Sequence, residues 1–259
     1  MKEYILITGA SSGIGYEMAK QLAIKNYNLL LVARSEDKLQ KLQHELHTQY
    51  KIEVEYLLYD LSEPNAAQDL YNHIKQNNYL VTGLINNAGF GDYGNFTEMP
   101  LKNDEEMIAV NITALVRLTK LFGADMAKQG KGKIMNVASL LSFLPFPYYS
   151  VYSATKSFVL AFTETVATEL EETGVIVTAL CPGTVETPFH TNAMRKTNAM
   201  NTNKPMPADV VAKAGVELFI NGKGKKIVGF LNWFLSNLPR VTPDKIMMKI
   251  KKNLASIKH

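Results

Sequence analysis

Short apolar runs alternate with longer stretches in which the apolar positions recur at helical spacing. The apolar runs are typical of buried strands, and the longer stretches are typical of amphipathic helices. The pattern predicts strands at residues 4–8, 28–33, 54–61, 83–89, 132–139 and 174–182. It predicts helices at residues 15–26, 35–50, 63–76, 103–128 and 152–173, with Pro64 in the first turn of the third.

This alternation favours a single α/β domain over residues 1–259. Parallel strands joined by right-handed crossovers give a doubly wound, Rossmann-type fold, with helices on both faces of a mostly parallel sheet of about seven strands. A chain of 259 residues is long for one domain but ordinary for one α/β sheet. Two segments depart from the alternation. We interpret the polar residues 187–206 as a substrate loop or lid, and residues 230–259 as a C-terminal extension.

Composition narrows the class of protein. Apolar residues make up 46% of the chain and charged residues 20%, which is typical of a globular protein. The single cysteine, Cys181, excludes a disulfide framework and a cysteine-based zinc site, and the histidines lack a metal-binding spacing, so no metal is expected. The apolar part of the N-terminus is short for a signal peptide, and we expect no membrane-spanning helix. These features favour a cytoplasmic location.

The positive charge gathers near the C-terminus. The formal net charge is +4, but no basic cluster in the body of the chain is interleaved with aromatic residues, so we expect no nucleic-acid partner. Residues 230–238 are strongly apolar, and residues 245–252 are basic and amphipathic. We favour a helix packed on the domain with a solvated basic end, since one short helix binds membranes only marginally. The alternative is a peripheral membrane contact or an entrance for a hydrophobic substrate.

A glycine-rich turn, ITGASSGIG, follows the first predicted strand and opens the first helix. Glycine permits a tight turn and lets a pyrophosphate approach the backbone, and the helix N-terminus offers free N–H groups to the phosphates. The pattern predicts a dinucleotide site; the alternative is a turn that only ends a strand. The predicted contacts on this turn are Gly9, Ser11, Ser12, Gly13, Ile14 and Gly15.

The end of the second predicted strand indicates which dinucleotide is bound. An acidic residue there would bind the ribose hydroxyls of NAD, but this chain has Arg34, with Lys38 one helical turn further on. A guanidinium binds a 2′-phosphate, which a carboxylate would repel. We therefore predict NADP(H), the alternative being that Arg34 is an ordinary surface charge. Asp60 and Leu61 are predicted to lie at the adenine, unless Asp60 caps the following helix instead.

Six motifs follow one another in a diagnostic order. They are TGASSGIG (8–15), NNAG (86–89), Asn111 in AVNITA, Ser139 in NVAS, YSATK (152–156) and PGTVET (182–187). In this order they resemble the short-chain dehydrogenase/reductase family over nearly the whole chain, and Arg34 resembles its NADP-preferring members. The resemblance implies a homodimer through the long helices and a catalytic set of Asn111, Ser139, Tyr152 and Lys156. It also implies cofactor contacts at Asn87, Ala88, Gly89, Tyr152, Lys156, Pro182, Gly183, Val185 and Thr187.

The chemistry of this set also follows from the residue types. Reduction of a carbonyl by hydride needs a proton at the developing alkoxide, and the ordinary tyrosine pKa of about 10 suits neutral pH poorly. Lys156, one helical turn from Tyr152, is expected to lower that pKa. Tyr152 is predicted as general acid and base, and Ser139 as a hydrogen-bond donor to the substrate oxygen. The resemblance implies that Asn111 holds a water linked to Lys156. Taken alone, Tyr152 and Lys156 would be interpreted as a surface pair.

Candidate substrate contacts are apolar. They are Phe90, Tyr93, residues 140–149, Phe189, Met194 and Met200. A large apolar lining favours an apolar ketone or aldehyde, reduced reversibly to its alcohol. Two alternatives stay open: a 3-oxoacyl thioester reductase, and a regulator that binds NADPH without turning over a substrate.

Overall fold

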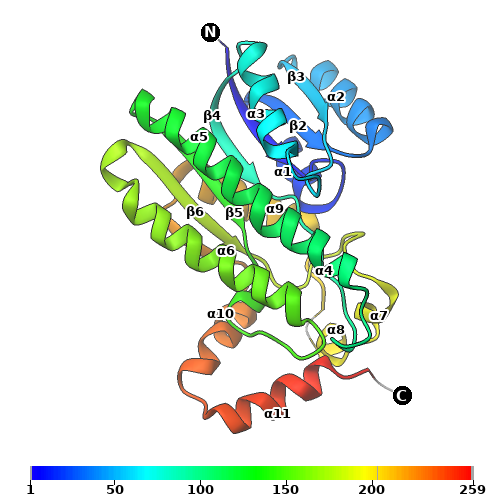
Figure 1. The fold of residues 1–259 in the computed structure, drawn as a ribbon. Coiled ribbons are helices and arrows are strands. Elements are labelled where there is room, and N and C mark those ends of the chain that lie inside the picture. The colour runs from blue at the N-terminus through cyan, green and yellow to red at the C-terminus, as the bar shows by residue number, and fades with distance from the viewer. Residues whose placement is uncertain (1, 203, 258–259) are drawn as a thin grey trace.

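A seven-stranded parallel sheet forms the centre of the molecule (Figure 1). The computed structural model describes residues 2–202 and 204–257. The strand order is β3-β2-β1-β4-β5-β6-β7, and every neighbouring pair is parallel. The strands are β1 Glu3–Thr8, β2 Asn28–Ala33, β3 Val54–Leu58, β4 Leu80–Asn86, β5 Gly132–Val137, β6 Val175–Cys181 and β7 Gly224–Ile227. The predicted doubly wound fold is confirmed.

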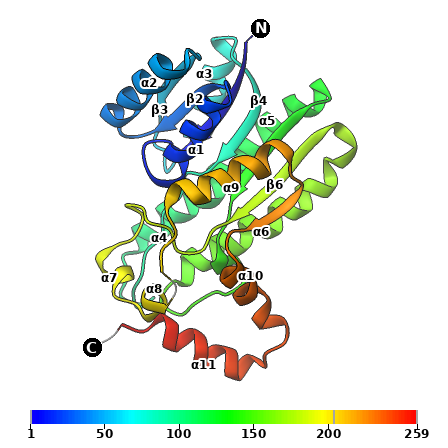
Figure 2. The same cartoon turned by 180° about the vertical axis from the view of Figure 1, so that it is seen from behind.

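Helices cover both faces of this sheet (Figures 1 and 2). One face carries α1 Gly13–Ile24, α2 Glu36–Tyr50 and α9 Ala208–Asn221. The other carries α3 Ala66–Gln76, α5 Leu115–Gln129 and α6 Ser150–Glu169. The remaining helical segments are α4 Leu101–Ile108, α7 Asn192–Arg195, α8 Asn198–Thr202, α10 Phe230–Asn237, α11 Asp244–Ala255, a π-helical segment η1 Ala109–Ala114, and the 3₁₀ turns η2 Leu140–Ser142, η3 Glu171–Thr173 and η4 Leu238–Arg240.

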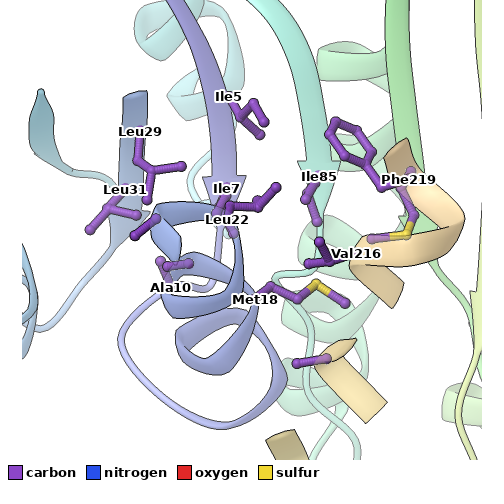
Figure 3. Packing of buried hydrophobic residues seen from close by; sticks show 14 of the residues in the cluster. Ile5, Ile7, Ala10, Met18, Leu22, Leu29, Leu31, Ile85, Val216 and Phe219 are labelled. Carbon is purple, nitrogen blue, oxygen red and sulfur yellow. The ribbon is translucent and has the colours of Figure 1, made fainter. Parts of the chain in front are cut away.

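The central strands are apolar on both faces because both faces are covered. Ile5 and Ile7 of β1 point to one side, where they pack in a cluster with Met18 and Leu22 of α1 (Figure 3). Leu6, between them in the sequence, belongs to the cluster on the opposite face. Successive strand residues point to opposite faces, so an unbroken apolar run is what a doubly covered strand requires.

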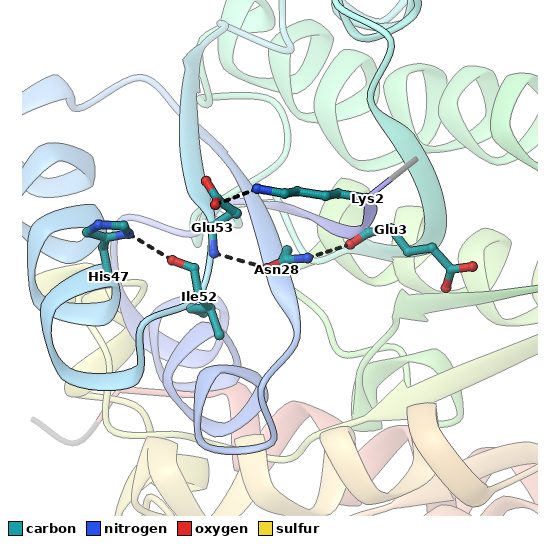
Figure 4. Close-up of polar contacts among 6 residues, drawn as sticks. All are labelled: Lys2, Glu3, Asn28, His47, Ile52 and Glu53. Carbon is teal, nitrogen blue, oxygen red and sulfur yellow. Dashed lines mark hydrogen bonds and ion pairs between the residues drawn. The ribbon is translucent and has the colours of Figure 1, made fainter.

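Polar contacts tie the amino ends of the first three strands together (Figure 4). The Asn28 side chain donates to the Glu3 carbonyl at 3.1 Å and accepts from the Glu53 N–H at 3.0 Å. Lys2 pairs with the Glu53 carboxylate at 2.6 Å. These contacts stabilise the register of β1, β2 and the start of β3 at the sheet edge opposite to the one where such folds bind ligands.

The start of α3 differs from the prediction. The helix begins at Ala66, so Pro64 precedes it and does not occupy its first turn. Asp60 accepts hydrogen bonds from the Ser62 N–H at 3.0 Å and from the Ser62 hydroxyl at 2.7 Å, which folds the chain after β3 into turns. Asp60 therefore caps a turn, and the alternative of a helix cap is not observed.

The longest helical stretch runs from Leu101 to Gln129 and is interrupted by the wider π-helical turn η1, where the sequence predicts one regular helix. By length and composition this stretch is apolar enough to cross a membrane, but 44% of its apolar window is buried inside the fold. There α5 packs against β4 and β5. Its apolar residues thus serve the core of the domain.

Candidate active site

A cavity of about 820 Å³ opens at the carboxyl ends of the strands, the edge at which doubly wound sheets bind ligands. Of the predicted site residues, Gly15 and Asn111 lie behind its wall, both buried. All the others line it: Gly9, Ser11, Ser12, Gly13, Ile14, Arg34, Lys38, Asp60, Leu61, Asn87, Ala88, Gly89, Ser139, Tyr152, Lys156, Pro182, Gly183, Val185 and Thr187. The fold thus brings together residues from six separate motifs.

The turn after β1 forms one end of the cavity and needs glycine at two positions. Gly9 has a φ of +68°, and a Cβ there would lie 2.9 Å from the Cα of Ala88. Gly13 has a φ of +58°, and a Cβ there would lie 3.0 Å from the side chain of Thr187. The Asn87 side chain donates to the Gly9 carbonyl at 3.1 Å and holds the turn against β4. The start of α1 is thereby held open toward the cavity, as a bound pyrophosphate requires.

Arg34 and Lys38 line the same end and are exposed. Arg34 Nη1 lies 3.3 Å from Asp60 Oδ2. Burial acts to raise the pKa of Asp60, but its hydrogen bonds with Ser62 and Arg34 outweigh burial and hold that pKa below its usual value. Both carboxylate oxygens of Asp60 therefore have protein partners. Asp60 holds Arg34 in place, while its predicted contact with adenine stays a prediction.

Tyr152 and Lys156 lie one turn apart on α6, and both side chains are buried. The Lys156 ammonium donates to the Val137 carbonyl at the end of β5, at 2.8 Å. Its Nζ lies 5.9 Å from the centre of the Tyr152 ring. The end of β5 thus fixes the ammonium beside the tyrosine, so the pair is not a surface pair.

Burial shifts the two pKa values in ways that the sequence does not indicate. Burial raises the pKa of Tyr152 to about 12, and a hydrogen bond with Ser139 acts in the opposite direction. Burial lowers the pKa of Lys156 to about 8. The expected lowering of the tyrosine pKa is therefore wrong for this structure, because desolvation of the phenolate outweighs its other interactions. A phenol that stays protonated at neutral pH is the form a proton donor needs.

Ser139 follows β5 and begins the short turn η2. Its Oγ accepts from the Leu141 N–H at 3.1 Å, and its own N–H donates to Ser142 Oγ at 3.3 Å. Ser142 in turn donates to the Lys156 carbonyl at 2.7 Å. These bonds tie the end of β5 to α6, so the hydroxyl of Ser139 is held at the phenol of Tyr152.

Asn111 lies in the π-helical turn, fully buried. Its side chain accepts from the Phe90 N–H at 3.1 Å and donates to the Phe90 carbonyl at 2.9 Å and to Thr155 Oγ1 at 3.1 Å. A Cβ on Gly89 would lie 2.9 Å from Asn111 Oδ1 and 3.4 Å from Lys156 Nζ. The Asn111 side chain thus holds the loop after β4 beside the lysine, while the water relay implied by the resemblance stays a prediction. Single π-helical turns are frequent at functional sites.

The other end of the cavity is mostly apolar. Phe90, Phe189 and Met200 line it as predicted, whereas Tyr93 and Met194 do not. The Tyr93 hydroxyl donates to the Ala255 carbonyl at 2.7 Å, and Met194 is buried. From residues 140–149, the lining includes Leu140, Leu141, Leu144, Phe146 and Tyr149.

The C-terminal extension supplies part of this wall, which sequence reasoning left open. Its contributions are Leu231, Leu235, Ile250 and Leu254. They come from α10 and α11, whose apolar spacing indicates a helix but does not say which side faces a cavity. Residues 258–259 of the extension lie outside the described residues.

The predicted lid forms a further wall. A bridge between Val185 and Met206 closes its base, where the Glu186 N–H donates to the Met206 carbonyl at 2.9 Å. The ring centre of Phe189 lies 5.5 Å from that of Tyr152. The loop therefore covers the tyrosine, as a substrate loop would; residue 203 within it lies outside the described residues.

Two known proteins with similar sequences are named as reductases. The very-long-chain 3-oxoacyl-CoA reductase of Anas platyrhynchos is 30% identical, over 97% of this chain and 80% of that protein. The protein of the same name from Pyrenophora tritici-repentis is 33% identical, over 90% of this chain and 71% of its own length.

Solved structures agree with this similarity. A short-chain dehydrogenase from Sphingobium yanoikuyae in complex with NADPH has a TM-score of 0.79 and 28% identity, over 94% of this chain and 97% of that one. The bulky-bulky ketone specific alcohol dehydrogenase of Comamonas testosteroni has a TM-score of 0.78 and 27% identity, over 93% and 92%. The family model for short chain dehydrogenase matches residues 3–198. The chain therefore belongs to the short-chain dehydrogenase/reductase family.

Proposed function

We propose that the protein is an NADP(H)-dependent reductase that converts an apolar ketone or aldehyde reversibly into its alcohol. The observation that carries this proposal is one cavity with a cationic end at Arg34 and a buried Tyr152 at its apolar end. Two solved relatives support it: one is bound to NADPH, and the other is specific for bulky-bulky ketones.

The residues of the cavity fit NADP(H). The glycine turn and the start of α1 suit the pyrophosphate, and the exposed Arg34 and Lys38 suit a 2′-phosphate. When bound, the cofactor supplies the hydride. Lys156 would bind the ribose next to the nicotinamide, and the chain segment from Pro182 to Thr187, which also lines the cavity, would contact the nicotinamide.

The chain's own residues move the proton. Tyr152 donates its phenol proton to the carbonyl oxygen as negative charge develops there, and Ser139 donates a hydrogen bond to the same oxygen. The Lys156 ammonium, 5.9 Å from the tyrosine ring centre, stabilises the phenolate that is left. In the oxidation direction the phenolate accepts the proton from the alcohol.

A second candidate is the reduction of a 3-oxoacyl thioester. The apolar wall contributed by α10 and α11 suits a long acyl chain. Relatives at about 30% identity carry the name very-long-chain 3-oxoacyl-CoA reductase. The reacting group would again be a ketone, so Tyr152, Ser139 and Lys156 would keep the same roles.

The test is a substrate screen that follows NADPH absorbance. It compares bulky aryl ketones, aldehydes and 3-oxoacyl-CoA thioesters of increasing chain length. We expect turnover, with the highest kcat/KM on bulky ketones if the first proposal holds, and a kcat/KM that rises with acyl length if the second holds. Binding of NADPH without turnover of any of these compounds would refute both and support the regulator hypothesis.

The homodimer and the cytoplasmic location stay predictions. A face that includes α4 and α6 exposes Ile108 and Phe158, and Phe158 stacks on Phe162 with ring centres 5.9 Å apart. We propose that the dimer forms there, which sedimentation velocity of the wild type and of Phe158→Ser would test. A wild-type monomer at micromolar concentration would contradict it.

A further inference from the structure

We propose that the C-terminal helices dock the protein on an anionic lipid bilayer, with the apolar end of the cavity at the membrane surface. Figures 1 and 2 show α10 and α11 together at one end of the molecule, beyond the carboxyl edge of the sheet. This docking does not depend on which carbonyl compound is reduced, and it would stand if the proposed function failed.

The burial pattern of α10 is the reverse of that of an ordinary surface helix. It buries the polar side chains of Asn232 and Ser236. It exposes four large apolar residues, which we call the aromatic face: Phe230, Leu231, Trp233 and Phe234. A surface helix normally turns its apolar stripe to the core, and contiguous exposed apolar patches mark interaction sites.

The polar side of α10 points into the domain, and its side chains are hydrogen-bonded there. A Cβ on Gly183 would collide with the Asn232 side chain, so this side chain lies against the chain segment that follows β6. Asn232 donates from its side chain to the Val228 carbonyl at 2.7 Å, and Ser236 donates to the Trp233 carbonyl at 2.7 Å. Phe230 is 80% exposed, and its ring centre lies 5.9 Å from that of Trp233 in a stacked arrangement. The aromatic face is therefore held outward by the fold and has no cover within the described part of the chain.

Exposed apolar side chains continue beyond α10, at Val241, Ile246 and Met248. They are interspersed with exposed basic side chains at Arg240, Lys245, Lys249 and Lys252. Residues 221–259 hold nine basic residues and one acidic residue, so their net charge is +8, while the other 220 residues carry −4. An exposed apolar face surrounded by basic side chains suits the surface of an anionic bilayer. The same charge would repel a second copy presenting the same face.

The aromatic face and the cavity share residues. Leu231 and Ile250 are exposed and also line the cavity, and Leu235 and Leu254 line it from the same two helices. An apolar substrate dissolved in the bilayer would thus reach the cavity without passing through water. The sequence favours a packed helix with a solvated basic end; the reversed burial of α10 is the observation that changes this preference.

Trp233 provides a direct probe, because it is the only tryptophan in the chain and is 52% exposed. The experiment mixes the full chain with vesicles of phosphatidylcholine alone, or of phosphatidylcholine with phosphatidylserine. We expect a blue shift of tryptophan emission and co-sedimentation with the anionic vesicles, both weakening as salt is raised. Neither signal with anionic vesicles would overturn the proposal. So would an emission that shifts to the blue with protein concentration alone, which would indicate a second copy on this face.

Two double variants test the apolar and the electrostatic contributions to vesicle binding. Phe230→Ser with Phe234→Ser keeps the tryptophan probe and should lower the partition coefficient on anionic vesicles by about tenfold or more. The matched control is Phe96→Ser, at a residue that is 62% exposed in the loop before α4. A double variant that binds as tightly as this control would overturn the proposal.

Lys245→Gln with Lys249→Gln should weaken binding and reduce its salt dependence, whereas Lys25→Gln with Lys41→Gln, on the opposite part of the domain, should not. Thermal unfolding monitors folding for every variant. If the aromatic variant fails to fold, the lysine pair still decides the matter, because the lysines lie at exposed positions where substitution costs little stability. Vesicle binding needs no turnover, so its failure is separate from failure of the proposed function.

Discussion

The two ends of the cavity are built in different ways. At the end formed by β1 and α1, the backbone makes the site: glycines with positive φ, strand ends, and the Asn87 side chain that holds the turn. At the end formed by α10 and α11, exposed and half-buried apolar side chains make the wall. A binding site made by the backbone cannot change without changing the fold. A binding site made by side chains on a terminal extension can change by substitution, with little loss of stability.

The largest expected effect is that of substituting Tyr152, which separates proton transfer from cofactor binding. Tyr152→Phe should lower kcat by roughly 10²–10⁴-fold, the usual contribution of a general acid, and leave NADPH binding unchanged. Stopped-flow turnover and fluorescence titration of NADPH would measure both. The matched control is Tyr149→Phe, a neighbouring tyrosine that also lines the cavity and whose pKa burial also raises to about 12. An inactive Tyr149→Phe variant together with an active Tyr152→Phe variant would show that Tyr149, and not Tyr152, donates the proton.

Charge reversal at Arg34 tests the cofactor end. Arg34→Asp should raise the Kd for NADPH by roughly 10–100-fold, since a charge-assisted hydrogen bond is worth about 1.5–3 kcal/mol, and should leave NADH binding little changed. Arg34→Lys, which keeps the positive charge, should lose much less affinity for NADPH. Stability should hardly change, because the pair with Asp60 is largely exposed. An unaltered ratio of NADPH to NADH affinity would refute the assignment.

The pH dependence should report Lys156. Because its pKa is lowered to about 8, the ammonium is lost above that pH, and kcat/KM for NADPH should fall by about tenfold per pH unit there, while Tyr152 stays protonated up to about 12. The free energy of unfolding should change with pH in the opposite direction to kcat/KM. From about pH 8 to 10.5 the unfolded chain binds more protons at this lysine than the folded chain does, so the free energy of unfolding rises with pH.

A pH–rate profile and chemical denaturation at several pH values check these two trends. A kcat/KM that stays constant to pH 10 would show that the charge of Lys156 is not needed. Lys156→Arg, whose guanidinium stays charged, is the variant whose profile should lose the fall above pH 8.

The smallest expected effect is at the other end of the cavity. Leu235→Ala should lower kcat/KM for long apolar substrates by about tenfold or less, with no change for short ones or for NADPH binding. Leu101→Ala, at an exposed leucine on α4, is the control. Equal losses on short and long substrates would mean that α10 supports the fold and not the substrate.

Much of the fold follows from local pattern. Runs such as residues 28–33 coincide with the observed strand because a doubly covered strand is apolar throughout. The prediction is wrong at the start of α3, because the bonds between Asp60 and Ser62 fold turns there that proline preferences alone do not predict. It also missed the π-helical turn around Asn111, whose side chain is held by Phe90, 21 residues away in the sequence.

The sequence by itself determined the order along the chain of the first six strands and the helices between them, the glycine turn, and the spacing of Tyr152 and Lys156, because backbone sterics and helical periodicity act between near neighbours. It did not locate α9 or β7. Only the tertiary structure decided the direction of the Tyr152 pKa shift, since desolvation depends on everything packed around the phenol. It also decided the orientation of α10, whose Asn232 side chain faces inward, where it lies against Gly183 and Met206. Composition and spacing carry no information on that choice, because it depends on contacts between segments far apart in the chain.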